Sequence, residues 1–164
     1  MLKLFKTKHK KLLGIDISSA SIKMLQISGS DEKYVIDAYG RVELPENAIE
    51  GNIIKDKDAI ARSIRHLAST ARISCKNAVI AVPDSSAISR VIQINEDLKE
   101  EDIEELVAIE ADKHIPYPID EINIDFEILG PSTKSSSMQD VLIVASRTEK
   151  VNDRVDIIHR AGLD

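Results

Sequence analysis

The pattern of apolar and polar positions predicts three consecutive strands near the start of the chain. Leu12–Ile17 is a short apolar run with one acid, Ile22–Ile27 alternates, and Tyr34–Tyr39 is rich in β-branched and aromatic residues. Segments rich in turn-forming residues, Ser18–Ser21 and Gly29–Glu32, separate the three runs. We therefore expect an antiparallel meander.

A helix and a buried strand are expected next. Apolar residues from Ile60 to Ala71 fall at helical spacing, and Asp58 is the expected N-cap. The continuous apolar run Ala78–Val82, which ends at Pro83, is typical of a strand covered on both faces. The order βββαβ, with a helical crossover into a buried strand, indicates the opening half of an α/β unit.

The remaining sequence predicts a second, inserted unit and a closing helix. Residues 84–147 have a βαββ pattern, and Asp97 with Glu100 resembles a capping box at the start of the helix. The strands are expected at Ala87–Ile94, Ile122–Leu129 and Asp140–Ser146. A last helix opens at Thr148 with Gly162 as its C-cap. Because the chain stops two residues later, we expect a truncated fold.

Composition narrows the class of protein. A chain of 164 residues with 43% hydrophobic and 30% charged residues is globular, and it is long enough for one domain or two small lobes. No apolar run is long enough to predict a membrane-spanning helix. The basic head lacks the apolar stretch and the cleavage site of a signal peptide. The single cysteine, Cys75, forms no disulfide framework, and the four histidines have no metal-ligand spacing. These features predict a cytoplasmic protein without a structural metal.

Charge is unevenly distributed. Five lysines and no acid lie in the first eleven residues, although the whole chain has a net charge of −6. The acidic body, with 3% aromatic residues and no Trp, excludes general nucleic-acid binding. The basic head is either a solvated tail or a weak attachment to an anionic membrane surface, at about 1 kcal/mol per lysine.

One hydroxyl-rich hairpin has the residues of a phosphate site. A strand delivers Asp16 to a tight turn, and the next strand opens with Lys23. Backbone N–H groups and hydroxyls at such a turn bind phosphate oxygens, a carboxylate orients a hydrated Mg²⁺, and a lysine adds a point charge. The candidate nucleotide-binding residues are Gly14, Asp16, Ser18, Ser19, Ser21 and Lys23, with Asp16 as the metal residue through water. The alternative is an ordinary polar hairpin.

A second candidate site lies on the helix of the inserted unit. Its acidic residues, with Glu101 and Glu105 among them, either form a solvated face or receive a basic peptide. Tyr117, between Pro116 and Pro118, is either an interface anchor or part of the local core. We predict partner binding by Glu101, Glu105 and Tyr117.

These motifs resemble a known family. LLGIDISSASIKMLQIS resembles the first phosphate loop of the actin-like ATPase superfamily, which includes hexokinase. The Ala-Val-Pro ending at Pro83, the βαββ insertion and the segment EADKHIPYPI at 110–119 narrow the resemblance to the PilM family of type IV pilus assembly proteins, relatives of FtsA. The resemblance implies an actin-like, ribonuclease H-like α/β subdomain 1A at 1–83 and 148–164 and an inserted subdomain 1C at 84–147. It also implies that the second lobe is absent.

The resemblance further implies a function. The family binds ATP and Mg²⁺ between two lobes, but Ser18 replaces the usual glycine, and half of the cleft is missing. We therefore expect no ATPase activity from this chain. The implied role is an adaptor, peripheral to the bacterial inner membrane, that binds the N-terminal peptide of a PilN-like protein between 1A and 1C and contacts other platform components. The alternatives are a sugar or acetate kinase and an FtsA-like filament protein.

Overall fold

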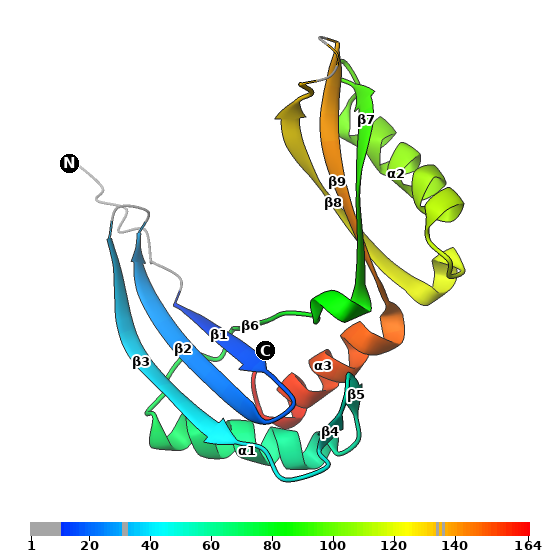
Figure 1. Ribbon diagram of the computed structural model, residues 1–164. Helices are drawn as coiled ribbons and strands as arrows, with labels where there is room; N and C mark the ends of the chain where they lie inside the picture. Colours follow the sequence, from blue (N-terminus) through cyan, green and yellow to red (C-terminus); the bar gives the residue numbers. More distant parts are fainter. Residues whose placement is uncertain (1–10, 31–32, 134, 136) are drawn as a thin grey trace, which may run out of the picture. The chain divides into compact units, whose positions relative to one another are not determined.

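The computed structural model describes residues 11–30, 33–133, 135 and 137–164, so the basic head lies outside the described residues. The chain divides into two compact units (Figure 1). Unit 1 comprises the residues up to Ala81 together with Asp153–Asp164, and unit 2 comprises Val82–Asn152. The boundaries expected from the sequence, after residues 83 and 147, lie close to these positions.

Unit 1 is built on a four-stranded sheet with the order β3-β2-β1-β6. The strands are β1 (Leu12–Ile17), β2 (Ser21–Ser30), β3 (Lys33–Glu43) and β6 (Ala78–Ile80). The first three pair antiparallel, as the predicted meander requires, and β6 runs parallel to β1. A short hairpin of β4 (Ile49–Glu50) and β5 (Ile53–Ile54) follows β3 in the chain.

Helices α1 (Lys57–Thr70) and α3 (Thr148–Arg160) supply the other half of the unit 1 core. Alternate residues of the strands face this core, which includes Leu13, Ile15, Ile22, Met24, Ile60, Ile64, Leu67, Ile157 and Ile158. Packing is close where α1 meets β3. A Cβ atom on Gly40 would lie 2.8 Å from Leu67 Cδ1 and 3.4 Å from Ala71 Cβ, so the absence of a side chain at Gly40 permits this approach.

The second face of the sheet is open among the described residues. The sequence predicted that the apolar strand at Ala78–Val82 would be covered on both faces, and this prediction is wrong. Strand β6 ends at Ile80, and Val79 is 56% exposed. Leu12, Leu25 and Tyr39 share the exposed face with Val79, because cross-strand partners point to the same side.

The ends of the helices confirm one predicted cap and correct two others. Gly162 has a φ of +77°, its N–H donates to His159 O, and the next N–H donates to Ile158 O, which is a Schellman motif. The N-cap of α1 is Asp56, whose Oδ1 accepts from Ala59 N at 2.8 Å, and not Asp58.

The predicted capping box of α2 (Glu100–His114) is also wrong. Lys99 is the N-cap and makes no side-chain cap hydrogen bond. Asp97 lies in a local turn, where its own N–H donates to Asn95 Oδ1 at 3.0 Å. An Asx turn at Asn95 therefore places Asp97 before the helix, and α2 begins after Lys99.

An ionic network joins α1 to α3. Lys57 Nζ lies 2.7 Å from Asp153 Oδ1 and 3.1 Å from Asp156 Oδ2. Arg160 continues the network through Nε, 2.9 Å from Asp156 Oδ1, and through Nη1, 2.7 Å from Asp58 Oδ1. Hydrogen bonds from Arg160 and then Lys57 lower the pKa of Asp156, and the bonds to Asp153 and Asp156 raise the pKa of Lys57.

Unit 2 has the βαββ order that the sequence predicted. Strands β7 (Ala87–Asn95), β8 (Ile122–Pro131) and β9 (Met138–Arg147) form an antiparallel sheet with the order β7-β9-β8. Helix α2 packs on one face of this sheet (Figure 1). The shared core includes Ile94, Ile103, Val107, Val141 and Ile143, and a smaller cluster contains Ala111, Ile115, Ile122 and Ala145.

Truncation of a buried side chain in unit 1 should lower the free energy of unfolding. Ile64 is fully buried against the sheet, so Ile64→Ala should lower the free energy of unfolding by about 2–5 kcal/mol. Ile53→Ala is the matched control, because Ile53 is 52% exposed and should lose less than about 1 kcal/mol. Urea denaturation followed by circular dichroism measures both changes, and equal losses would contradict this assignment of the core.

The ionic network should make stability depend on pH. Since the folded state lowers the pKa of Asp156 below its ordinary value of 3.8, its contribution is present above that value and is lost as pH falls through the folded-state pKa. Asp156→Asn should therefore be less stable than the parent at pH 7, and the difference should shrink as pH falls below about 4. Thermal unfolding at several pH values measures this, with Glu46→Gln, at an exposed carboxylate, as the control. A difference that does not change with pH would exclude the network as its source.

Candidate functional site

The β1–β2 hairpin places the predicted charged residues side by side. Asp16 and Lys23 are directly opposite in the antiparallel register, and Lys23 Nζ lies 3.0 Å from Asp16 Oδ2. Their side chains are 61% and 59% exposed, so the pair contributes at most about 1 kcal/mol. A weak, exposed pair can separate at little cost, which leaves the carboxylate and the ammonium group available to a ligand.

The serines of the turn have different roles in the structure. Ser18 donates to Ser21 O through both its N–H, at 3.0 Å, and its hydroxyl, at 2.9 Å. Ser21 is buried, with its hydroxyl 3.3 Å from that of Ser18. Ser18 and Ser21 therefore close the turn, and Ser19 is exposed next to them. Of the three serines, Ser19 has the side chain that an incoming anion reaches first.

A shallow hollow adjoins the charged pair on the open face of the unit 1 sheet. Its volume is about 350 Å³, and its lining comprises Gly14, Ile15, Asp16, Lys23, Met24, Leu25, Val79, Ile80 and Ala81. Gly14 lies opposite Leu25, so the absence of a side chain at Gly14 keeps the centre of the hollow open. The hollow combines an apolar floor with one acid and one base at its edge.

The donor set fits a hydrated metal that a ligand brings with it. No group of three or more His, Cys, Asp or Glu residues within the described part of the chain could hold a metal ion alone. Asp16 offers one carboxylate, which is what Mg²⁺ needs when phosphate oxygens and water complete its shell. Gly14, Asp16, Ser19 and Lys23 together therefore fit one side of a site for a phosphate–metal complex.

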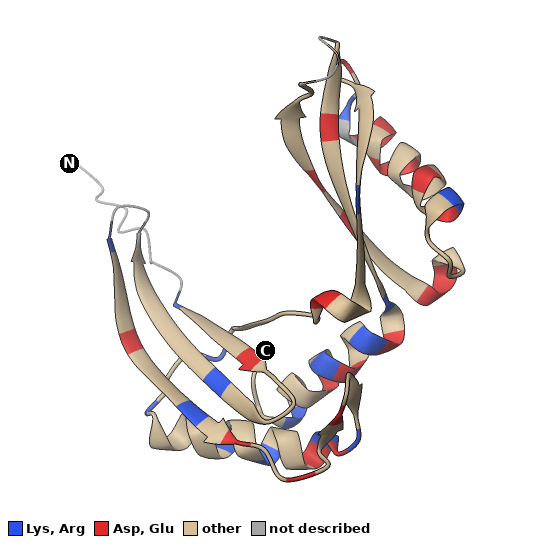
Figure 2. Cartoon of the chain, in the orientation of Figure 1, with Lys and Arg blue, Asp and Glu red and all other residues tan. Residues whose placement is uncertain are grey.

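The predicted partner-binding residues belong to unit 2. Glu101 and Glu105 are one turn apart on α2 and both are exposed, whereas Ile103 and Val107 are buried. Figure 2 shows acidic residues along the exposed side of α2. Near the end of α2, hydrogen bonding from Lys113 and then the charge of His114 lower the pKa of Glu110. The helix therefore presents carboxylates to the solvent and apolar residues to its sheet.

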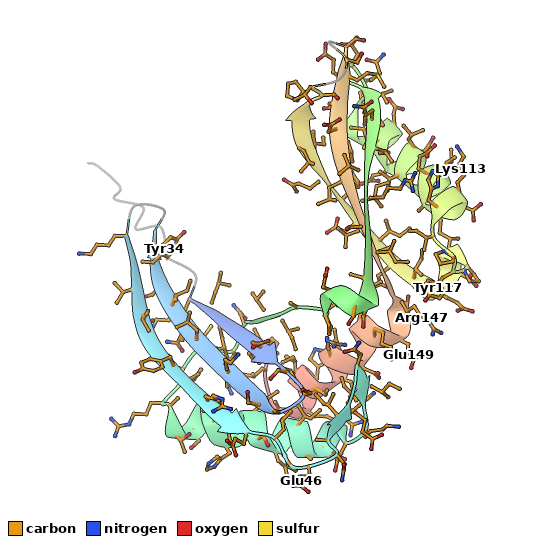
Figure 3. All side chains as sticks on the ribbon, viewed as in Figure 1. Tyr34, Glu46, Lys113, Tyr117, Arg147 and Glu149 are labelled. Carbon is orange, nitrogen blue, oxygen red and sulfur yellow. The ribbon has the colours of Figure 1, made fainter. Side chains whose placement is uncertain are left out.

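Tyr117 packs on a residue that the sequence interpretation missed. Its ring lies 5.4 Å from Arg147 Cζ, a cation–π geometry, and the side chains meet in Figure 3. Tyr117 is 40% exposed and lies outside the core clusters, whereas Ile115 belongs to one of them. Arg147 also lies 3.9 Å from Glu121 Oε2 and 3.7 Å from Glu149 Oε2. The sequence near Arg147 shows only a basic residue at the end of an apolar strand, which does not indicate a contact with Tyr117.

No helix within the described residues is long and apolar enough to cross a membrane. The structure thus has two candidate sites. One is the hollow beside Asp16 and Lys23 in unit 1, and the other is the acidic and aromatic surface of unit 2. Each site is formed within its own unit.

Comparison with known proteins identifies the family. The sequence model described as "Type IV pilus assembly protein PilM" matches residues 14–164. Among solved structures, a chain of the "PilM-PilN type IV pilus biogenesis complex" has a TM-score of 0.81 and 27% identity, over 93% of this chain and 45% of that chain. This chain thus spans less than half the length of that relative.

Two more distant structures were also found. A Bacteroides thetaiotaomicron protein with an actin-like ATPase fold and unknown function has a TM-score of 0.41 and 14% identity, over 96% of this chain and 52% of that chain. An Aquifex aeolicus member of the Ppx/GppA family has a TM-score of 0.28 and 20% identity, over 43% of this chain and 26% of that chain. The mixed α/β fold with a βαββ unit that the sequence predicted is confirmed, and the chain belongs to the PilM family of type IV pilus assembly proteins.

Proposed function

We propose that this chain is part of an adaptor of the type IV pilus assembly platform and that it binds the cytoplasmic N-terminal peptide of a PilN-like inner-membrane protein. The similarity to a chain of a PilM–PilN complex, with a TM-score of 0.81, is the observation that carries this proposal. Contacts with other platform components, and a position beside the inner membrane, belong to the same proposal.

The surface of unit 2 has the chemistry for such a peptide. Exposed Glu101 and Glu105 attract basic residues from a distance and so increase the rate of encounter. Tyr117 offers a ring and a hydroxyl group at low entropic cost, which is typical of an interface anchor. Since Arg147 holds the ring from one side, the exposed part of Tyr117 is already oriented before a partner arrives.

Charge and anchor variants should act on different rate constants. Glu101→Lys and Glu105→Lys should slow association with the N-terminal peptide of a PilN-like protein and reduce its dependence on salt. Tyr117→Ala should instead speed dissociation, about 30-fold for an anchor worth about 2 kcal/mol. Biolayer interferometry at two salt concentrations measures both rates.

Matched controls for this experiment come from unit 1. Glu46→Lys changes the same charge at another exposed position, and Tyr39→Ala removes an aromatic ring that is 75% exposed. Both controls should bind the peptide as the parent does, and circular dichroism must show all variants folded. If folded variants at positions 101, 105 and 117 also match the parent, the peptide binds elsewhere.

A second proposed function is binding of the phosphates of ATP with Mg²⁺. The hollow beside Asp16 and Lys23 favours it, because it joins an apolar floor to a carboxylate and an ammonium group. Asp16 would orient water on the metal, Lys23 would lie against phosphate oxygens, and Ser19 would donate from the turn. When bound, the metal would neutralise phosphate charge.

This chain alone should not turn over ATP. Phosphoryl transfer needs the nucleotide, the metal and the attacking water to be held together, and the β1–β2 hairpin supplies one side of such a site. Phosphate release should therefore stay at the background rate, for the parent and for Asp16→Ala alike. Turnover that persists through purification and disappears in Asp16→Ala would contradict this expectation.

A further inference from the structure

A shallow groove lies between α2 and β8, which is one of the two edge strands of the unit 2 sheet. It has a volume of about 230 Å³, and its lining comprises Glu104, Val107 and Ala108 of α2 with Ile124, Asp125 and Phe126 of β8. Ile128, which follows Ile124 and Phe126 in the alternation of β8, is 42% exposed. The groove therefore has an apolar floor, with the carboxylate of Glu104 on its α2 side.

Among the described residues, the main chain beside the groove has one edge without a strand partner, and on this edge the Phe126 N–H is bound only by a neighbouring side chain, which an incoming strand would have to replace. Within the described residues β8 has a strand partner, β9, on one side only. The N–H of Phe126 donates to Asp125 Oδ1 at 2.9 Å, so it points away from β9 toward the open edge. Because inward and outward main-chain groups alternate along an antiparallel strand, those of Ile124 face the same edge. The residues whose side chains line the groove thus also present their main chain to an incoming strand.

The side chains at this edge of β8 favour an incoming strand that carries basic residues. Asp125 and Glu127 are exposed on the opposite face of β8 from Ile124 and Phe126. β8 contains no Lys or Arg, and α2 has none before Lys113. A strand paired with this edge would place alternate side chains on the apolar groove and beside the two acids.

We propose that the groove between α2 and β8 binds an extended segment of a partner protein in which aliphatic and basic residues alternate, by adding it as a fourth strand beside β8. Main-chain hydrogen bonds to Ile124 and Phe126 would provide affinity, and aliphatic side chains would fill the groove over Val107 and Ala108. Basic side chains on the other face would pair with Asp125 and Glu127. This surface is separate from the residues assigned above to the PilN-like peptide.

The test uses the full chain and an eight-residue peptide of alternating Leu and Lys. On binding, hydrogen exchange at the amides of Ile124 and Phe126 should slow. A peptide of the same composition with its Leu and Lys residues in two blocks should bind at least about tenfold more weakly, as should an alternating peptide N-methylated on the face that pairs with β8.

Variants of the chain complete the test. Glu104→Lys combined with Asp125→Lys should weaken binding about tenfold, which corresponds to about 0.7 kcal/mol for each charge. The matched control, Glu96→Lys with Asp97→Lys, changes the net charge by the same amount at exposed positions just after β7 and should bind as the parent does. Tyr117→Ala, measured in parallel, should leave the affinity for the alternating peptide unchanged, so this proposal and the PilN-like proposal can fail separately. Equal binding of alternating, blocked and N-methylated peptides, or unchanged exchange at Ile124 and Phe126, would overturn it.

Discussion

The register of the β1–β2 hairpin is the constraint on which the unit 1 site depends. Leu13 and Ile15 must enter the core together with Ile22 and Met24, and this fixes which residues face each other across the hairpin. A shift of one residue would bring charged side chains into the core and expose the apolar ones, at a cost of several kcal/mol. The same register puts Asp16 opposite Lys23, so core packing determines the geometry of the charged pair.

In unit 2 the same alternation of side chains along a strand separates apolar from acidic residues. Along β8, one set of side chains packs toward α2 and the other carries acids, and the main-chain directions alternate in step with them. α2 adds a helical period, with Ile103 and Val107 buried and the carboxylates outside. As a result, charged and apolar surfaces lie next to each other. A surface of this kind recognises a pattern of residues as well as net charge.

Much of the fold could be predicted from the sequence, because long alternating runs and helical spacing are local. The three-strand meander, the βαββ order and the cap at Gly162 are of this type. The errors arose where two local solutions compete. Asp56 and Asp58 are both plausible N-caps, and Asp58 is instead bound by Arg160 from a distant helix. Periodicity also could not show that Val79 is exposed, because coverage depends on which elements reach that face.

The candidate sites were predicted as residue types rather than as arrangements. The sequence placed Asp16 and Lys23 on one hairpin, and the family resemblance was confirmed, but the different roles of the three serines depend on hydrogen bonds that close the turn. Arg147 lies thirty residues from Tyr117 in sequence, so no local pattern could pair them.

The close approach of α1 to β3 at Gly40 has a consequence for how relatives can diverge. Because an added Cβ would lie 2.8 Å from Leu67 Cδ1, a larger residue at position 40 requires either a shift of the helix or a smaller side chain at position 67. Substitutions at these two positions should therefore be inherited together, so that one change is tolerated only on the background of the other. The limited space between helix and sheet thus couples the effects of substitutions at positions 40 and 67, which is epistasis.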